Sequence, residues 1–176
     1  QLMQTIYEEL GFKVSVIATP AKRGIMLLNE GAVDADVIRL KPTIKRYDNV
    51  LLVEPALTHG HLVLLCNKTV LCDESVLLDA KAQIQAHAGI LNLFETGELK
   101  AQITLKEMVA DTLNMLEETH VFYALYTVNA HRHKTLSTKF NILKLKDVSG
   151  YHVIHKKHAH LLPAIQQKIQ DKLAAD

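Results

Sequence analysis

Thr43 and Arg46 are the residues whose types and spacing best suit the binding of an anion. A planar guanidinium can bind a carboxylate through two parallel hydrogen bonds, which the ammonium group of lysine cannot reproduce. The hydroxyl of Thr43 can add a hydrogen bond, and the backbone amides of the same loop can complete an anion-binding nest. The two residues could therefore contribute to an anion-binding site. The alternative is that Arg46 is an exposed residue at a strand start, paired with Asp48 or Glu54.

The stretch from Pro20 to Pro55 contains the elements that would position these side chains. Its pattern predicts a helix, a glycine turn, a short strand, a polar loop that ends at Arg46, and a second strand. Open α/β sheets bind ligands beyond the carboxyl ends of their strands. The order of elements therefore places Thr43 and Arg46 at such an edge.

The rest of the chain also alternates between helical and strand patterns. We expect helices over 2–10, 21–29, 75–89, 104–118 and 161–176, and strands over 13–20, 31–40, 50–57, 61–66, 90–97, 120–128, 140–148 and 151–158. The helix over 104–118 is the clearest, because Thr104 and Glu107 form a capping-box pattern at its start. The alternation predicts an α/β class with two lobes. The first lobe would comprise 1–62 and about 146–176, and the second about 63–145.

The beginning of the sequence bears on the completeness of the fold. A helical pattern comes first, with Gly11 as its C-cap, and a strand pattern follows. A right-handed crossover in an α/β sheet needs a strand before the helix. We therefore expect the fold to be N-terminally incomplete, lacking its first strand and any leader that would indicate its compartment.

The composition and the absence of known motifs exclude several classes of function. The 176 residues are 48% hydrophobic and 22% charged, which is typical of a globular protein. A net charge of +1 gives no long-range attraction to nucleic acid or to an anionic membrane. No sequence motif for a nucleophile, a phosphate-binding loop or a metalloprotease is present, so we expect neither an enzyme nor a cofactor.

Two cysteines, Cys66 and Cys72, lie close together in CNKTVLC. They can be two reduced, buried, small hydrophobic residues. They can equally form a local disulfide if the protein is exported. Their spacing argues against a zinc pair and against a Cys-x-x-Cys redox motif.

Ten histidines are many for this length. On strands, His59 and His61 would share a side, and so would His131 and His133, which makes a metal site conceivable. No acidic residue suited to orienting such ligands is evident, so we expect surface and hinge histidines and no metal. His61 would lie near the hinge, where protonation could alter opening.

An ordered set of residues resembles the first lobe of the extracytoplasmic solute-binding proteins of the amino-acid type (solute-binding protein family 3), which have the type 2 periplasmic-binding-protein fold. These residues are Pro20, Arg23, the Leu-x-x-Gly-x-x-Asp pattern from Leu28 through Gly31 to Asp34, the Thr-x-x-Arg pattern from Thr43 to Arg46, and Glu54-Pro55. The C-terminal strand with lysines and the long closing helix also resemble the family. The resemblance implies an α/β, two-lobed fold with a mixed sheet in each lobe.

The resemblance assigns roles to two arginines. In the family, the arginine of Thr-x-x-Arg binds the carboxylate of the ligand, and Arg46 matches it. In some relatives of this fold an arginine soon after the Gly-x-x-Asp pattern lines the ligand cleft or bridges the lobes, and Arg39 matches it. Lys41 stands where amino-acid binders commonly have a small hydroxyl residue, so the chemistry of the site differs there.

The second lobe departs from the family pattern. Amino-acid binders usually have a Gly-Arg-x-Asp-like segment whose aspartate binds the ammonium group, and the stretch 118–123 has no such aspartate. Tyr123, Tyr126 and His120 can supply aromatic and polar contacts to a ligand instead, and core packing is the alternative for each. The expected consequence is a different ligand or a degenerate site.

The resemblance implies a periplasmic, non-enzymatic protein that captures a small polar or carboxylate-bearing molecule between two lobes for an ABC transporter. Its partner would be a membrane permease or a receptor, and nucleic acid would not bind. The alternatives are a ligand-sensing domain of a membrane signalling receptor and an effector domain of a transcriptional regulator. A disulfide between Cys66 and Cys72 would argue against the cytoplasmic regulator.

Overall fold

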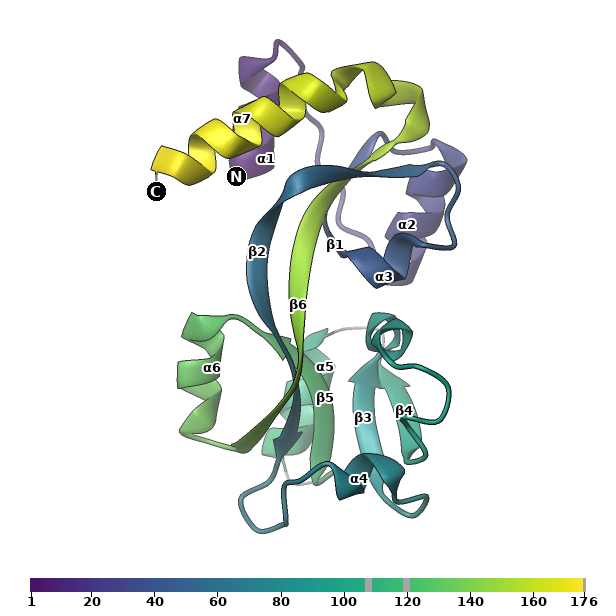
Figure 1. Ribbon diagram of the computed structural model, residues 1–176, viewed down its shortest axis with the longest axis vertical. Coiled ribbons are helices and arrows are strands. Elements are labelled where there is room, and N and C mark those ends of the chain that lie inside the picture. The colour runs from purple at the N-terminus through teal and green to yellow at the C-terminus, as the bar shows by residue number, and fades with distance from the viewer. Residues whose placement is uncertain (107–108, 119–120, 176) are drawn as a thin grey trace. The chain divides into compact units, whose positions relative to one another are not determined.

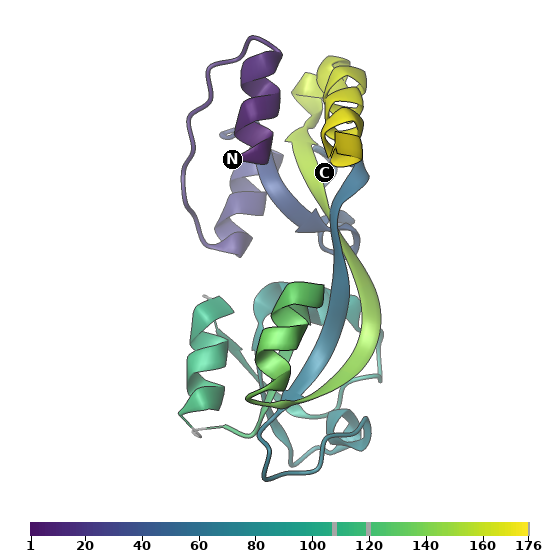
Figure 2. The same cartoon turned by 90° about the vertical axis from the view of Figure 1, so that its left-hand side faces the viewer.

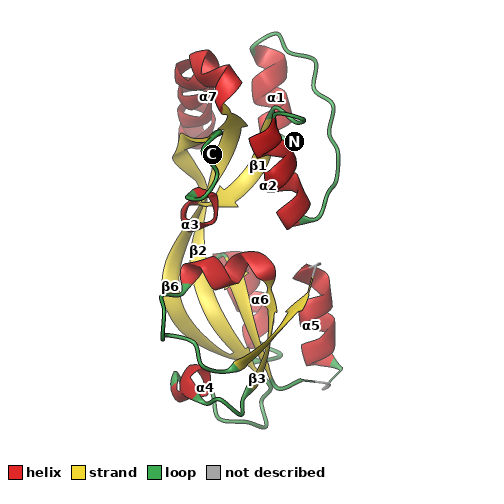
Figure 3. Ribbon diagram, turned by 90° about the vertical axis from the view of Figure 1, so that its right-hand side faces the viewer, coloured by secondary structure: helices red, strands yellow, loops and turns green. Residues whose placement is uncertain are grey.

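The protein, seen here as a computed structural model, is described over residues 1–106, 109–118 and 121–175 (Figure 1). Its contacts divide the chain into two compact units. Unit 1 comprises 1–58 and 149–176, and unit 2 comprises 59–148. Two long strands, β2 (Val50–Cys66) and β6 (Asn141–His155), continue from one unit into the other and are neighbours in the sheet (Figure 3).

Unit 1 combines one end of these two strands with helices and a short edge strand. Its other elements are α1 (Leu2–Glu9), α2 (Ala21–Glu30), β1 (Ala35–Leu40), α3 (Lys41–Ile44), the 3-10 helix η2 (Lys156–Leu161) and α7 (Leu162–Ala175). The strand order is β1-β6-β2, and β1 pairs antiparallel with β6. Helix α2 ends at Gly31, whose φ of 76° is the left-handed conformation that glycine adopts without strain.

The sheet of unit 1 is covered on both faces. On β6, Ile154 belongs to a core with side chains of α1 and α7, while the neighbouring Val153 packs with Ile25 and Leu28 of α2. Alternate residues of a strand point to opposite faces, which explains this division. The alternation also makes register decisive, because a slip of one residue moves a side chain to the other face.

The register between β1 and β6 slips once. Asp36 pairs with Val153, whereas Arg39 pairs with Tyr151, so two residues of β1 oppose the single residue His152 of β6. This is the pattern of a β-bulge. In a regular strand, residues three apart face opposite sides. The bulge instead places Asp36 and Arg39 on the same face, the one covered by α2.

Unit 2 holds the remaining elements around a mixed sheet. They are α4 (Ser75–Leu78), β3 (Gln83–His87), the 3-10 helix η1 (Ala88–Leu93), β4 (Gln102–Lys106), α5 (Val109–Glu117), β5 (Tyr123–Val128) and α6 (Ala130–Ser137). The order is β6-β2-β5-β3-β4, with β2 and β5 antiparallel and β5, β3 and β4 parallel. The run 62–66 of β2 is fully buried, because its alternate side chains enter separate cores on the two faces. Its unbroken apolar sequence is typical of a strand covered on both faces.

Several expected elements differ in the structure. The stretch 75–89 is not one helix but contains α4 and β3, and 90–97 holds most of η1 instead of a strand. Thr104 lies inside β4, so it does not cap a helix, and Glu107 lies outside the described residues. The two strands expected over 50–57 and 61–66 form the single strand β2. Those expected over 140–148 and 151–158 form the single strand β6, which ends at His155.

The segment 13–19 was expected to be a strand and is not one. It runs as an extended loop between α1 and α2 (Figure 2). Within the described part of the chain, no backbone hydrogen bond joins 13–19 to another residue, and the side chains of Val16 and Ile17 are exposed. β-branched residues favour a strand only when a neighbouring strand pairs with them.

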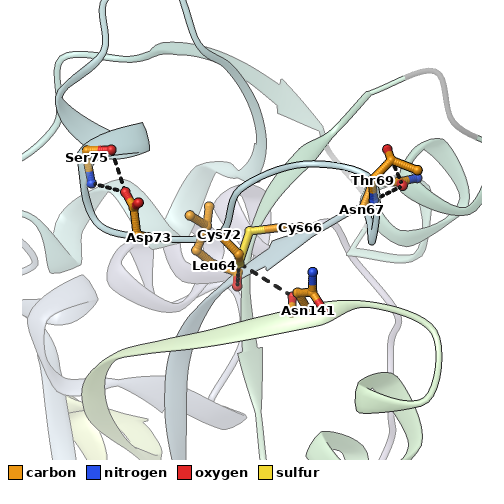
Figure 4. Close-up of a disulfide and its surroundings, with 8 residues drawn as sticks. All are labelled: Leu64, Cys66, Asn67, Thr69, Cys72, Asp73, Ser75 and Asn141. Carbon is orange, nitrogen blue, oxygen red and sulfur yellow. Dashed lines mark hydrogen bonds between the residues drawn. A yellow bond between two sulfur atoms is a disulfide. The ribbon is translucent and has the colours of Figure 1, made fainter.

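A disulfide joins Cys66 at the end of β2 to Cys72 in the following loop, with their Cα atoms 5.7 Å apart (Figure 4). The sequence left this pairing open. The bridge fixes the loop against the buried end of β2, because Cys66 itself is fully buried in the core that contains Leu64 and Ile84.

Reduction of this disulfide should lower the free energy of unfolding by about 2 kcal/mol. The reason is that closing a loop of this length reduces the conformational entropy of the unfolded chain, and reduction restores that entropy. Chemical denaturation of the oxidised and the reduced protein measures the difference. The double variant Cys66→Ala/Cys72→Ala is the control and should not respond to reductant. An unfolding free energy that reductant leaves unchanged in the native sequence would contradict a structural bridge.

Candidate functional site

The candidate site lies at the carboxyl end of β1 in unit 1. Arg39 is the penultimate residue of β1, and Leu40 is followed directly by the single turn of α3. Because of the bulge, Asp36 joins Arg39 on the α2 side of the sheet. Ligands of open α/β sheets bind beyond the carboxyl ends of strands, so this edge is the natural place for a ligand in unit 1.

Asp36 and Arg39 form an ion pair. The Nε of Arg39 donates to Oδ2 of Asp36 at 2.8 Å, and one terminal nitrogen of the guanidinium donates to the same oxygen. The side chain of Arg39 is 15% exposed and that of Asp36 is 22% exposed, so the pair is largely but not wholly removed from water. A guanidinium has five N–H groups, and the pair occupies only two of them. Arg39 therefore keeps donors for a second anion.

Gly24 of α2 makes room for this pair. A Cβ atom at Gly24 would lie 2.8 Å from a terminal nitrogen of Arg39, 2.9 Å from Oγ1 of Thr19 and 3.3 Å from Oδ2 of Asp36. The guanidinium therefore packs directly on the helix backbone at the one position without a side chain. Three separate segments meet at this point, namely the end of the loop 13–19, the first half of α2 and β1.

Thr43 has a structural partner. Its Oγ1 donates to the carbonyl oxygen of Leu40 at 2.7 Å, which closes the turn between β1 and α3. In this conformation the hydroxyl proton is used within the turn, so Thr43 can offer a ligand only the lone pairs of its oxygen. Its place beside the carboxyl end of β1 is nevertheless the one expected from the sequence.

Arg46 lies in the exposed turn that follows α3. It is thus on the same connection as Arg39 and Thr43, and the neighbouring Lys41 and Lys45 are exposed as well. The structure brings Arg39, Thr43 and Arg46 to one region of unit 1. Asp36 is the residue that sequence reasoning missed, because an aspartate and an arginine three apart on a strand face each other only where a bulge intervenes.

The tyrosines of unit 2 occupy core positions. Tyr123 begins β5 and pairs in register with Cys66, at the opposite end of β5 from its carboxyl edge. Tyr126 is 2% exposed, its burial raises the pKa of its hydroxyl, and Arg132 lies over its ring at 5.4 Å. His120 lies outside the described residues. The geometry therefore lends no support to a ligand contact by Tyr123, which stays a sequence prediction.

The carboxyl edge of the parallel strands in unit 2 has a different composition. Strands β3, β4 and β5 end there at His87, Lys106 and Val128, and Asn129 follows as the cap of α6. None of these described residues is an acid. The Nδ1 of His87 accepts a hydrogen bond from the backbone N–H of Gly89.

Two of the histidines hydrogen-bond aspartates. His61 contacts Asp147 at 2.7 Å, and His158 contacts Asp34 at 2.7 Å. Hydrogen bonds from His158 and Lys157 lower the pKa of Asp34. Among the described residues no group of three or more metal-binding side chains is gathered. His131 and His133 lie on α6, so the shared side that a strand would give them does not apply.

Behind the bulge lies a buried polar pair. The hydroxyl of Tyr7 on α1 hydrogen-bonds Nε2 of His152 on β6 at 2.8 Å, and His152 is 1% exposed. Nδ1 of His152 makes no hydrogen bond of normal geometry to another described residue, although the backbone of Val37 and Asp36 lies near enough to favour the protonated ring. Burial outweighs that effect and lowers the pKa of His152 to about 4.

Comparison with known proteins identifies the fold. No protein-family model and no curated protein matches the chain. Among solved structures, the substrate-binding protein of an amino acid ABC transporter gives a TM-score of 0.81 at 15% identity, covering 99% of this chain and 80% of that one. The arginine-bound, truncated ArgBP from T. maritima gives 0.75 at 14% identity, with 97% and 82% covered. A histidine kinase sensor domain similar to periplasmic binding proteins gives 0.77 at 18% identity, with 99% and 78% covered.

The expected fold is therefore confirmed. The chain has the two-lobed α/β fold of type 2 periplasmic binding proteins, and most of these structural neighbours are ligand-binding proteins rather than enzymes. No helix in the described part of the chain is long and apolar enough to cross a membrane.

The buried His152 predicts a specific pH dependence of stability. Its pKa in the folded protein, about 4, lies below the unfolded value of 6.5, so the unfolded chain binds the proton first as pH falls. The free energy of unfolding should be constant above about pH 6.5 and fall by about 3 kcal/mol towards pH 4. Urea denaturation at several pH values measures this. His152→Gln should flatten the slope, whereas His131→Gln, an exposed control, should keep it.

The substitution Gly24→Ala should displace Arg39 without lowering the stability of the fold. Alanine in a helix interior is favoured over glycine by about 1 kcal/mol, and the atom nearest the new methyl group is a terminal nitrogen of Arg39, the end of a long side chain. We expect an unchanged or higher unfolding midpoint together with a displaced Arg39 guanidinium, seen as a shift of its Nε–H resonance. Lys22→Ala, an exposed control in α2, should leave that resonance in place. An Arg39 resonance that stays in place in Gly24→Ala would contradict this packing.

Proposed function

We propose that this chain is an extracytoplasmic solute-binding protein of the amino-acid type that binds a small polar, carboxylate-bearing molecule. The observation that supports the proposal most is the position of Arg39, whose side chain is 15% exposed, at the carboxyl end of β1. It is held from one side by Asp36 and retains donors for a ligand carboxylate. The fold, shared with proteins that bind amino acids, supports the same class of ligand.

Arg39 takes the main role in this proposal, and Arg46 and Thr43 assist. Arg39 is fixed by packing on Gly24 and by its ion pair, so little side-chain entropy is lost when it binds a ligand. Arg46 is exposed and adds positive charge to the same connection. Thr43 holds the turn through Leu40 and can accept a hydrogen bond from the ligand.

We infer a periplasmic location and a partner in the membrane, either an ABC transporter permease or a receptor. The disulfide between Cys66 and Cys72 supports this, because disulfides persist in oxidising compartments and are rare in the cytoplasm. It also disfavours the effector domain of a cytoplasmic transcriptional regulator. A sensing role is the second candidate, favoured by the likeness to a histidine kinase sensor domain. We propose binding rather than catalysis in either case.

A thermal-shift screen against amino acids and small carboxylates tests the proposal. A solute at one hundred times its dissociation constant should stabilise the protein by about 2.7 kcal/mol, which corresponds to a rise of about 5–10 °C in the unfolding midpoint. Arg39→Ala should abolish the shift, and Arg46→Ala should reduce it. Lys45→Ala removes an exposed charge from the same connection and is the matched control.

Two results would contradict the proposal. One is the absence of a shift with every polar solute tested on the folded, disulfide-bonded protein. The other is a shift that persists unchanged in both Arg39→Ala and Arg46→Ala, since the ligand would then bind elsewhere.

A further inference from the structure

We propose that Asp36 determines the specificity of this site, because it sets a carboxylate beside Arg39 and so selects ligands that carry a cationic group next to their own carboxylate. The inference rests on the proposed function, in which Arg39 binds the ligand. It assigns to a residue of β1 the recognition of the positive end of the ligand.

The geometry leaves Asp36 with acceptor capacity. Both hydrogen bonds from Arg39 end on Oδ2 of Asp36. Within the described part of the chain, Arg39 is the only residue that forms an ion pair with Asp36, so Oδ1 can accept from a ligand. The side chain of Asp36 remains 22% exposed, so it is not sealed from solvent. The pair therefore presents unused donors of Arg39 and an unused acceptor of Asp36 side by side.

Asp36 also weakens the attraction of this site for simple anions. Without this aspartate, the connection from β1 to the turn after α3 would carry only Arg39, Lys41, Lys45 and Arg46 as charged residues before Asp48. Such a surface would attract any carboxylate. A negative charge hydrogen-bonded to Arg39 weakens its attraction for a ligand that brings negative charge alone. A ligand that adds an ammonium group compensates for that loss.

The described residues at the carboxyl ends of the parallel strands of unit 2 include no acid. The described residues that end β3, β4 and β5 are His87, Lys106 and Val128, followed by Asn129. Among the described residues at these strand ends, an acid hydrogen-bonded to a guanidinium lies only on β1. This is the reason for assigning the recognition of a cationic group to Asp36 and not to unit 2.

Matched pairs of ligands test the proposal by isothermal titration calorimetry. The probes are L-glutamate with glutarate and L-arginine with 5-guanidinopentanoate, in which the second member lacks only the α-ammonium group. For the pair that binds, the native protein should prefer the amino acid by about 100-fold or more. Asp36→Asn should reduce this preference to below about 5-fold while the des-amino acid binds as well as before or better. Asp36→Glu should restore part of the preference.

The outcomes separate the two proposals. If neither member of any pair binds the native protein, and the wider screen is also negative, the proposed function fails. If Arg39→Gln loses binding while Asp36→Asn keeps the full preference, the site stands and the role of Asp36 is overturned. If folded Asp36→Asn loses both ligands equally, Asp36 only holds Arg39 in place, which also overturns the specificity claim. Circular dichroism of each variant confirms that it is folded.

Discussion

A single extra residue in β1 shapes the candidate site. Side chains alternate along a strand, so Asp36 and Arg39 would face opposite sides of a regular sheet. The bulge opposite His152 turns both towards α2, where Gly24 lets the guanidinium lie on the helix backbone. On the other side, Tyr7 hydrogen-bonds the buried His152. One local arrangement therefore contains the ion pair, the close helix contact and the buried polar pair. A regular register in β1 would not allow it to form.

The sequence indicated the elements whose signals are local. The apolar face and the glycine at position 31 were enough to place α2, and the amphipathic pattern near the C-terminus was enough to place α7. Elements that depend on distant partners were wrong. The segment 13–19 has strand-forming residues but no pairing strand among the described residues, and Thr104 has the signal of a helix cap but pairs with Gln85 in a parallel ladder. Tertiary pairing overrode local preference in both cases.

The site was predictable only in its broad position. Sequence spacing and family resemblance placed Thr43 and Arg46 at a strand edge and gave Arg39 a secondary role, whereas the geometry makes Arg39 the better supported residue. A bulge leaves no signature in residue types, so the partnership with Asp36 could not be read from the sequence. The disulfide of Cys66 was likewise undecidable beforehand, since it depends on how the loop after β2 returns to the sheet.

We propose Arg39, oriented by the bulge and by Asp36, as the residue that binds the ligand. The most direct measurement follows the arginine Nε–H resonances by NMR while L-arginine or L-glutamate, whichever stabilises the protein, is added. The Arg39 resonance is assigned by its loss in Arg39→Lys. This resonance should shift with the same saturation curve as the thermal stabilisation. A ligand that stabilises the protein and leaves the Arg39 resonance unmoved would contradict it.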